Sequence, residues 1–431
     1  MQRTLRLLTF PILFCSLQCV GLAQSTLLDN VTNFEFGTPV NDVVYDSSLD
    51  VLYASVPSSG GSLANSIATI DPSNGSVLSS VFVGDNPNTL AISDDGSHIF
   101  VGLDGDQGVR SFQPATGTLS PILPLTVASG AGGFFVNDAI AQDIAVLPSQ
   151  PSVAVISTDT VGSTASGVLT LFDSSTSTTT QISTSFLNGS NNVVEFLNPT
   201  TLITQNTASS SFDVTTFSLN GTTLTELSQS SVGNGFDVTF DIGDDDRLFF
   251  SDGRVVDSAT LSQLGLFNTG FTGFNFSQQL VEPVTDLDLV YFVGDSGGNI
   301  TLSAFDTNNF LQVDSITLPT SLTFADDGGD LIVAGQNRLA FVFKEDEFDG
   351  AGGPGTLNII SGVPTAAVPE PSSLTLMMFV GGLLVTRRQR VPAVVVWERK
   401  GDAANSVRRA ARLLEWGFLG GLFFLFGWLA D

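Results

Sequence analysis

The chain has 431 residues, with 15 Lys+Arg against 43 Asp+Glu and a formal net charge of −28 at pH 7. Most of the positive charge lies near the two ends, so residues 24–385 hold only 5 basic residues against 39 acidic ones, a formal charge of −34. Such a surface repels nucleic acid and anionic lipid, and the sequence therefore predicts no nucleic-acid partner.

The first 23 residues have the pattern of a secretory signal. Arg3 and Arg6 make a basic start, a short apolar run follows, and small residues lie before a cleavage point at Ala23. We expect residues 1–23 to bring the chain to the Sec machinery and to be cut off after Ala23. The alternative is a buried N-terminal helix, but the run is short and contains no acid.

The two cysteines, Cys15 and Cys19, both lie within this signal. The mature chain is therefore predicted to contain no disulfide, no thiolate nucleophile and no cysteine metal ligand. The exported protein would depend on packing alone for its stability.

Residues 24–349 consist of short Val/Ile/Leu/Phe runs separated by Asp, Gly, Ser, Asn and Pro, a pattern typical of many strands and turns. The segment 31–57 aligns without a gap on 78–104, with Gly37 on Gly84, at an offset of 47 residues. Repeats spaced about 40–55 residues apart suit a four-stranded propeller blade. Seven strand starts of this kind are predicted, at 42–46, 89–93, 143–147, 193–197, 237–241, 283–287 and 321–325.

The last repeat lacks an outer strand. It has apolar runs at 331–335 and 339–347, and then the chain becomes rich in Gly and Pro. The segment 30–37 at the other end aligns with an outer strand, so we expect the N-terminal strand to complete the seventh blade and cover an open sheet edge. The predicted fold is thus all-β, a seven-bladed β-propeller closed by an N-terminal strand. The chief alternative is an array of two or three β-sandwich domains.

The best-patterned repeat, NSIATIDPSNGSVLSSVFVGDNPNTLAISDDGSHIFVGLDG (65–105), resembles the repeats of YVTN-type, lactonase-like seven-bladed propellers. In those repeats an Asp and a Gly follow a strand, and a Gly and a Pro lead into the next inner strand and its Asp-Gly turn. The resemblance covers residues 28–347 and implies the propeller fold. It also keeps open an alternative function, a secreted lactonase-like or other hydrolase on the same fold.

The body offers few groups for catalysis. Its one histidine, His98, follows an Asp-Asp-Gly-Ser turn, and we interpret it as a turn-flanking polar residue. The sequence therefore predicts no catalytic residue and no cofactor. The basic residues of the body are scattered, at Arg110, Arg247, Arg254, Arg338 and Lys344.

Acidic turns remain as candidates for a calcium site. Carboxylate-rich loops hold Ca²⁺, and Asp104 and Asp106 in the turn 103–108 are the best pair. None of the acidic turns has the spacing of an EF-hand. Asp-Gly sequences are also what a tight turn requires, so the same residues have a purely structural interpretation.

The C-terminal region has a separate organisation. Residues 350–368 are predicted to form a flexible linker, rich in Gly and Pro. A Pro-Glu-Pro motif, 12 apolar-leaning residues at 374–385 and a cluster of arginines then follow in order. This order resembles the PEP-CTERM sorting signal of Gram-negative bacteria, predicted here over 369–390. The matching residues are Pro369, Glu370, Pro371, Arg387, Arg388 and Arg390.

The resemblance implies recognition by an exosortase, a membrane cysteine peptidase that cuts at or near the motif. It also implies a destination in the envelope or extracellular matrix of bacteria that make exopolysaccharide. Before processing, the short apolar segment would hold the chain in the inner membrane, with the arginines on the cytoplasmic side. An ordinary C-terminal membrane anchor is the alternative.

Such signals normally end the chain, whereas here residues 391–431 follow. They comprise a basic amphipathic helix candidate at 405–416 and a second short apolar segment at 417–430. These segments either place C-terminal helices in the membrane or are a reading-frame artefact. The function predicted from the sequence is an exported, exosortase-sorted propeller with a binding, adhesion or structural role, with exopolysaccharide or other envelope components as partners.

Overall fold

The computed structural model describes most of the body of the chain. The described residues are 27–126, 139–160, 163–182, 192–207, 211–232, 238–270, 279–296, 298–319, 327–344 and 355–366. They all belong to one compact unit, Met1–Ala367. The predicted signal peptide with Ala23, the predicted PEP-CTERM residues and the tail 391–431 lie outside them. Within the described residues, no helix has the length and apolar character that crossing a membrane requires.

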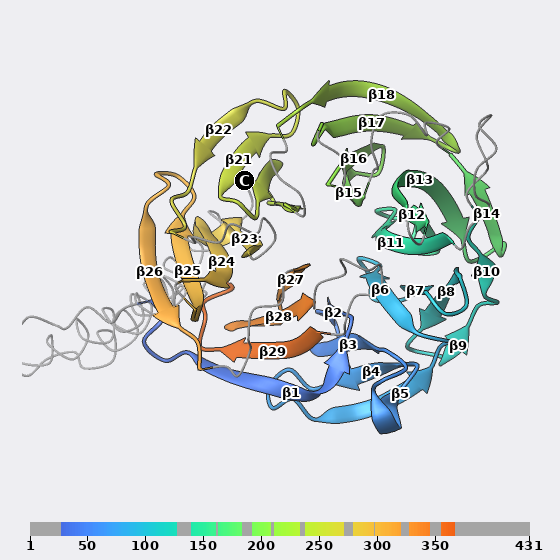
Figure 1. The fold of residues 1–431 in the computed structure, drawn as a ribbon, viewed down its shortest axis with the longest axis horizontal. Helices are drawn as coiled ribbons and strands as arrows, with labels where there is room; N and C mark the ends of the chain where they lie inside the picture. The colour runs from blue at the N-terminus through green and yellow to red at the C-terminus, as the bar shows by residue number, and fades with distance from the viewer. Residues whose placement is uncertain are drawn as a thin grey trace, which may run out of the picture. The chain divides into compact units, whose positions relative to one another are not determined.

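Seven antiparallel sheets are arranged in a ring around a common axis (Figure 1). Each is a blade whose first strand lies nearest the axis. Blade 1 consists of β2 (Asp42–Asp46), β3 (Val51–Val56), β4 (Ser66–Ile70) and β5 (Val77–Phe82). Blade 2 consists of β6 (Pro87–Ile92), β7 (Ile99–Leu103) and β8 (Gly108–Gln113), with β9 (Thr118–Leu119) and β10 (Leu123–Pro124) both on β8. Blade 3 consists of β11 (Ala139–Val146), β12 (Val153–Thr160), β13 (Ser163–Asp173) and β14 (Thr178–Gln181).

The remaining blades follow the same order. Blade 4 consists of β15 (Val193–Asn198), β16 (Thr201–Gln205), β17 (Val214–Asn220) and β18 (Thr223–Ser230). Blade 5 consists of β19 (Phe240–Ile242), β20 (Arg247–Phe250), β21 (Arg254–Asp257) and β22 (Gln263–Leu266). Blade 6 consists of β23 (Gln279–Val284), β24 (Leu289–Asp295), β25 (Ile300–Asp306) and β26 (Gln312–Thr317), and blade 7 of β27 (Asp327–Val333), β28 (Arg338–Lys344), β29 (Gly355–Ser361) and β1 (Thr32–Val40). Two 3₁₀ turns, η1 (Gly61–Leu63) and η2 (Thr285–Leu287), complete the described elements.

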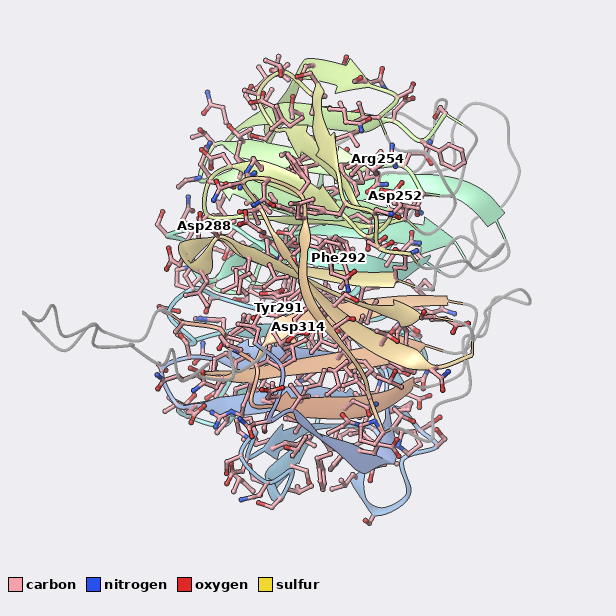
Figure 2. All side chains as sticks on the ribbon, turned by 90° about the vertical axis from the view of Figure 1, so that its left-hand side faces the viewer. Asp252, Arg254, Asp288, Tyr291, Phe292 and Asp314 are labelled. Atoms are coloured by element: carbon pink, nitrogen blue, oxygen red, sulfur yellow. The ribbon has the colours of Figure 1, made fainter. Side chains whose placement is uncertain are left out.

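The position of a strand within its blade decides which of its residues are apolar. All six residues of β3 are buried because both faces of this strand lie against neighbouring blades, whereas five of the six residues of the outermost strand β5 are exposed. Apolar clusters fill the space between adjacent blades. Between blades 5 and 6 the cluster is aromatic and includes Phe292, which is labelled in Figure 2. The ring of Phe267 lies 5.6 Å from that of Phe292 and 5.4 Å from that of Phe305. Burying each such ring contributes about 1.5–3 kcal/mol to folding.

The two ends of the described chain meet in blade 7, as the sequence predicts. The blue strand β1 lies outermost, beside the orange strand β29 (Figure 1), and pairs with it from Thr32 opposite Ser361 to Val40 opposite Gly355. The N-terminal strand therefore closes the ring, and the prediction of a propeller completed in this way is confirmed.

The strand assignment within blade 7 was wrong in one respect. The third strand, β29, lies inside the segment 350–368 that the sequence predicts to be a linker, so that segment is not a linker throughout. The runs at 331–335 and 339–347 correspond to the first and second strands rather than the second and third, and 321–325 lies outside the described residues. The Gly- and Pro-rich residues before β29 are typical of a flexible linker. The local sequence therefore does not indicate this strand, which is identified only by its pairing across the ring.

Most predicted inner strands are confirmed. The segment 42–46 coincides with β2, and the predicted starts at 89–93, 143–147 and 193–197 overlap β6, β11 and β15. The sixth prediction, 283–287, is displaced. There β23 ends at Val284, and residues 285–287 form η2, which Asp288 ends in a left-handed conformation with a φ of 55°.

Candidate functional site in the central channel

The inner strands surround a cavity of about 1010 Å³ along the axis of the ring. All seven blades contribute to its lining, from β2, β6, β11, β15, β19, β23 and β27. The lining combines apolar side chains with amides, hydroxyls and carboxyls, and no Lys, Arg or His occurs among its described residues.

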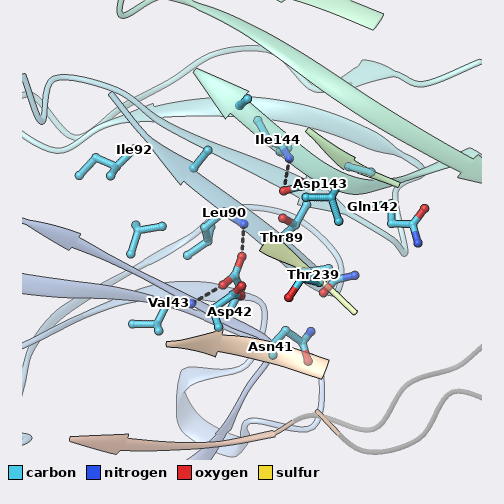
Figure 3. Close-up of a pocket in the computed structure, with 18 of the residues that line it drawn as sticks. Asn41, Asp42, Val43, Thr89, Leu90, Ile92, Gln142, Asp143, Ile144 and Thr239 are labelled. Atoms are coloured by element: carbon cyan, nitrogen blue, oxygen red, sulfur yellow. Dashed lines mark hydrogen bonds between the residues drawn. The ribbon is translucent and has the colours of Figure 1, made fainter. Parts of the chain in front are cut away.

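Two of the lining carboxylates join neighbouring blades, and Figure 3 shows the bond from Asp42 to Leu90. Asp42 accepts the N–H of the next residue, Val43, at 2.7 Å and the N–H of Leu90 in blade 2 at 2.6 Å. Asp143 repeats the arrangement, accepting from Ile144 at 2.8 Å and from Val194 in blade 4 at 2.7 Å. Because each carboxylate receives backbone donors from two blades, it holds their inner edges together.

Four further carboxyl groups lie on the inner strands of successive blades: Glu195 (β15), Asp241 (β19), Glu282 (β23) and Asp330 (β27). All but Glu282 line the cavity, and Glu282 interacts with Asp241. Asp241 and Glu282 hydrogen-bond to each other through their carboxyl groups. Burial, together with the neighbouring acids, raises the pKa of Asp241 to about 6 and holds those of Glu195 and Glu282 well above their usual range. Desolvation disfavours the charged form of each group, and no described cation in the lining offsets it.

The proposed calcium residues lie in the turn after β7. Asp106 accepts the backbone N–H of Asp85 at 2.6 Å, and the N–H of Asp104 donates to the carbonyl of Asn86 at 3.0 Å. Among the described residues, no group of three or more His, Cys, Asp or Glu side chains stands close enough to hold one metal ion. Calcium binding by Asp104 and Asp106 stays a prediction.

His98 lies in the hairpin between β6 and β7 and contacts side chains of its own blade. Its Nδ1 is 2.8 Å from the hydroxyl of Ser97, and its Nε2 is 3.0 Å from the amide nitrogen of Gln113. Partial burial lowers the pKa of the imidazole, and the carboxylate of Asp95 partly offsets that effect.

The arginines near the blade turns are engaged in local pairs. Arg247 reaches Asp245 at 2.5 Å and Arg254 reaches Asp252 at 2.7 Å, the latter pair visible in Figure 2. The guanidinium of Arg247 also donates to the carbonyl of Thr307 at 2.9 Å. The proximity of Arg247 and Arg254 in the sequence therefore does not produce a joint site, because each is held at its own turn of blade 5.

No protein-family model matches the chain, and no curated protein matches it. Solved structures do. The chain is similar to the structure of U3-55K, with a TM-score of 0.53 and 10% identity over 77% of this chain and 98% of that one. Hydrazine synthase of Kuenenia stuttgartiensis matches with a TM-score of 0.52 and 12% identity, over 74% of this chain and 96% of that one. The WD40 repeats of RRP9 match with a TM-score of 0.52 and 11% identity, over 77% of this chain and 97% of that one.

These identities are low, so the similarity concerns the fold alone. Together with the sheet topology, it defines the body of this chain as a seven-bladed β-propeller.

Sequence reasoning missed the acids of the channel. A signal was present, because Glu195 interrupts an apolar run in the predicted inner strand 193–197. In a chain with 43 acids such an interruption carries little weight, and only the ring brings acids of separate blades together.

Proposed function

We propose that this chain is an exported propeller with a non-enzymatic role in binding, adhesion or structure at the envelope or in the extracellular matrix of a Gram-negative bacterium. The chemistry of the channel is the observation that supports this role. Its described lining offers carboxyl, amide, hydroxyl and apolar groups that can hold a ligand, while Asp42 and Asp143 are committed to backbone donors. Exopolysaccharide or another envelope component is the proposed partner.

We further propose that the chain is sorted through its PEP-CTERM signal by an exosortase-type peptidase, after export by the Sec machinery. The ordered motif at Pro369–Pro371 and the arginines behind it support this proposal. The last blade strand, β29, ends at Ser361, before the motif. A cut at the motif would therefore leave every blade complete, and the propeller would be released intact.

The test is the intact mass of the protein from membrane and medium fractions of its native host. A mature form that ends near Pro369–Pro371, and that is absent from an exosortase-deficient strain, would support the sorting proposal. Glu370→Gln should abolish this form, whereas Glu226→Gln, a matched change on β18, should leave it unchanged. A membrane form that retains residues 391–431 in the wild-type strain would contradict it.

A hydrolase on the same fold is the second candidate, favoured by the paired carboxyl groups of Asp241 and Glu282 beside a large cavity. Purified protein would be assayed with lactone and glycoside substrates, next to Asp241→Asn. Turnover that the variant loses while its circular dichroism spectrum stays unchanged would favour the hydrolase. Equal, background rates for both proteins would favour the binding role.

A further inference from the structure

The inner strands use carboxyl groups at a recurring position to join one blade to the next. A backbone N–H of the following blade donates to the acid in three cases. The acid and donor pairs are Asp42 with Leu90, Asp143 with Val194, and Glu282 with Val333. The first two pairs are separated by 48 and 51 residues, close to one repeat. These bonds link blade 1 to 2, blade 3 to 4 and blade 6 to 7.

The acid also normally accepts the N–H of the residue that follows it. Val43, Ile144 and Ile242 supply this donor in blades 1, 3 and 5. In blade 6 the residue after Glu282 is Pro283, which has no N–H to donate. Glu282 therefore keeps hydrogen-bonding capacity that the other acids use locally, and it meets Asp241 of blade 5 instead.

The junction between blades 5 and 6 consequently differs from these three. It joins an acid to an acid rather than an acid to a backbone donor. Two ionised carboxylates only accept hydrogen bonds and repel each other, so such a bond exists only while one of the two groups carries a proton.

We propose that Asp241 and Glu282 form a proton-dependent bond between blades 5 and 6, which strengthens the ring at acidic pH and is lost when the shared proton leaves. This inference concerns the body of the protein and stands apart from its sorting or its ligand.

The surroundings of the pair contain acids but no countercharge. Glu195 on β15 and Asp330 on β27 both interact electrostatically with Asp241, and Asp244 lies near Glu282. On the packed strands, Arg247 of β20 is directed to Asp245 and Thr307, and Tyr291 of β24 donates to the carbonyl of Pro364 at 2.6 Å. Asp286 of η2 is exposed. The deprotonated pair would thus meet repulsion from the other channel acids.

The direction of the pH effect follows from the raised pKa of Asp241, about 6, and that of Glu282, well above its usual range. In the unfolded chain both groups return to a pKa near 4. The folded state therefore holds a proton that the unfolded state releases. Over the interval from about pH 4 to 6 and beyond, the unfolding equilibrium constant should rise up to about tenfold per pH unit from this proton.

The test compares wild-type full-length protein with Glu282→Gln in denaturant unfolding between pH 5 and 8. The amide of Gln accepts from Val333 and donates to Asp241 without a shared proton, so the geometry is kept. Glu226→Gln on exposed β18 removes the same charge away from the channel. The logarithm of the unfolding constant should rise less steeply with pH in Glu282→Gln, by up to about one unit per pH unit, while Glu226→Gln keeps the wild-type slope. Equal slopes in Glu282→Gln and wild type would overturn the proposal.

A second measurement does not depend on stability. The infrared carbonyl band of a protonated carboxylic acid should persist in the folded wild-type protein at pH 5.5 to 6, where exposed carboxyl groups are ionised. Asp241→Asn and Glu282→Gln should each reduce this band, whereas Glu226→Gln should not. A band that is unchanged in both channel variants would show that the pair holds no proton.

Discussion

The side-chain amide of Asn33 donates a 2.8 Å hydrogen bond to the side-chain carbonyl of Asn358, across 325 residues of sequence. Asn33 lies on the first described strand and Asn358 on the last one, so the bond crosses the closure of the ring. Asn358 is fully buried, and a buried amide left without a partner would cost about 1–3 kcal/mol. Closure therefore rests on side chains as well as on the backbone ladder between β1 and β29.

Leu28, just before β1, should be the most sensitive apolar residue of this closure. It is 2% exposed, packs between blades 6 and 7, and its N–H donates to Asp314 at 2.9 Å. Leu28→Ala should lower the free energy of unfolding by about 2–5 kcal/mol in denaturant titrations. Leu78→Ala, at a site 57% exposed on β5, should change it by less than about 0.5 kcal/mol. Equal effects would mean that the N-terminal segment does not close the ring.

Deleting the chain up to residue 40 removes β1 and leaves β29 with an open edge. We expect such a truncated protein to melt at a lower temperature than the intact body and to aggregate more readily, because an unpaired strand edge templates association. Thermal melts followed by circular dichroism, with light scattering, check this. An unchanged melting temperature would contradict the closure.

Asp42 should be needed as a carboxylate rather than as a polar group. Asp42→Asn keeps the shape but replaces one acceptor oxygen by a donor, which cannot accept from both Val43 and Leu90. The free energy of unfolding should fall by about 1–3 kcal/mol. Asp94→Asn, at an exposed position in blade 2, is the matched control and should be near neutral. A small effect at Asp42 would show that the bond between blades 1 and 2 contributes little.

Gly362 follows β29 with a φ of 89°, and a β-carbon there would lie 2.4 Å from the carbonyl oxygen of Asn30. Gly117 also has a positive φ, 67°, but nothing lies within 4 Å of a β-carbon there. Gly117→Ala should therefore cost about 1 kcal/mol for the backbone conformation alone. Gly362→Ala should cost clearly more, because the backbone of the N-terminal segment must shift. Denaturant titration of both variants measures the difference.

His98 should titrate below the ordinary histidine pKa of about 6.5. It is the only histidine of the chain, so its imidazole protons give a single NMR titration curve without assignment. A lowered pKa means that the folded state prefers the neutral ring, so its contribution to stability is present above about pH 6.5 and is lost as the pH falls below that value. His98→Gln should remove this loss. A titration at or above pH 6.5 would contradict the effect of burial.

The propeller was predictable because its signal is local and repeated. Alternating apolar residues and Asp-Gly turns recur at each blade, and the offset between the first two repeats, marked by Gly37 and Gly84, gives the blade length. The prediction of strands was less accurate where the local sequence pattern is weak. The strand β29 follows a Gly- and Pro-rich stretch, and it is a strand because β1 and β28 pair with it on both sides.

The sequence by itself determined the β-propeller class, the acidic body, the lack of cysteine after residue 19 and the missing outer strand of the last blade. These properties depend on composition and on patterns within one repeat. Only the tertiary structure decided which acids of separate blades meet. Asp241 and Glu282 are 41 positions apart and look like any other acids of the chain. They meet because ring closure directs the inner strands of blades 5 and 6 to one axis, and Pro283 leaves Glu282 without the local N–H donor that Asp42 and Asp143 have.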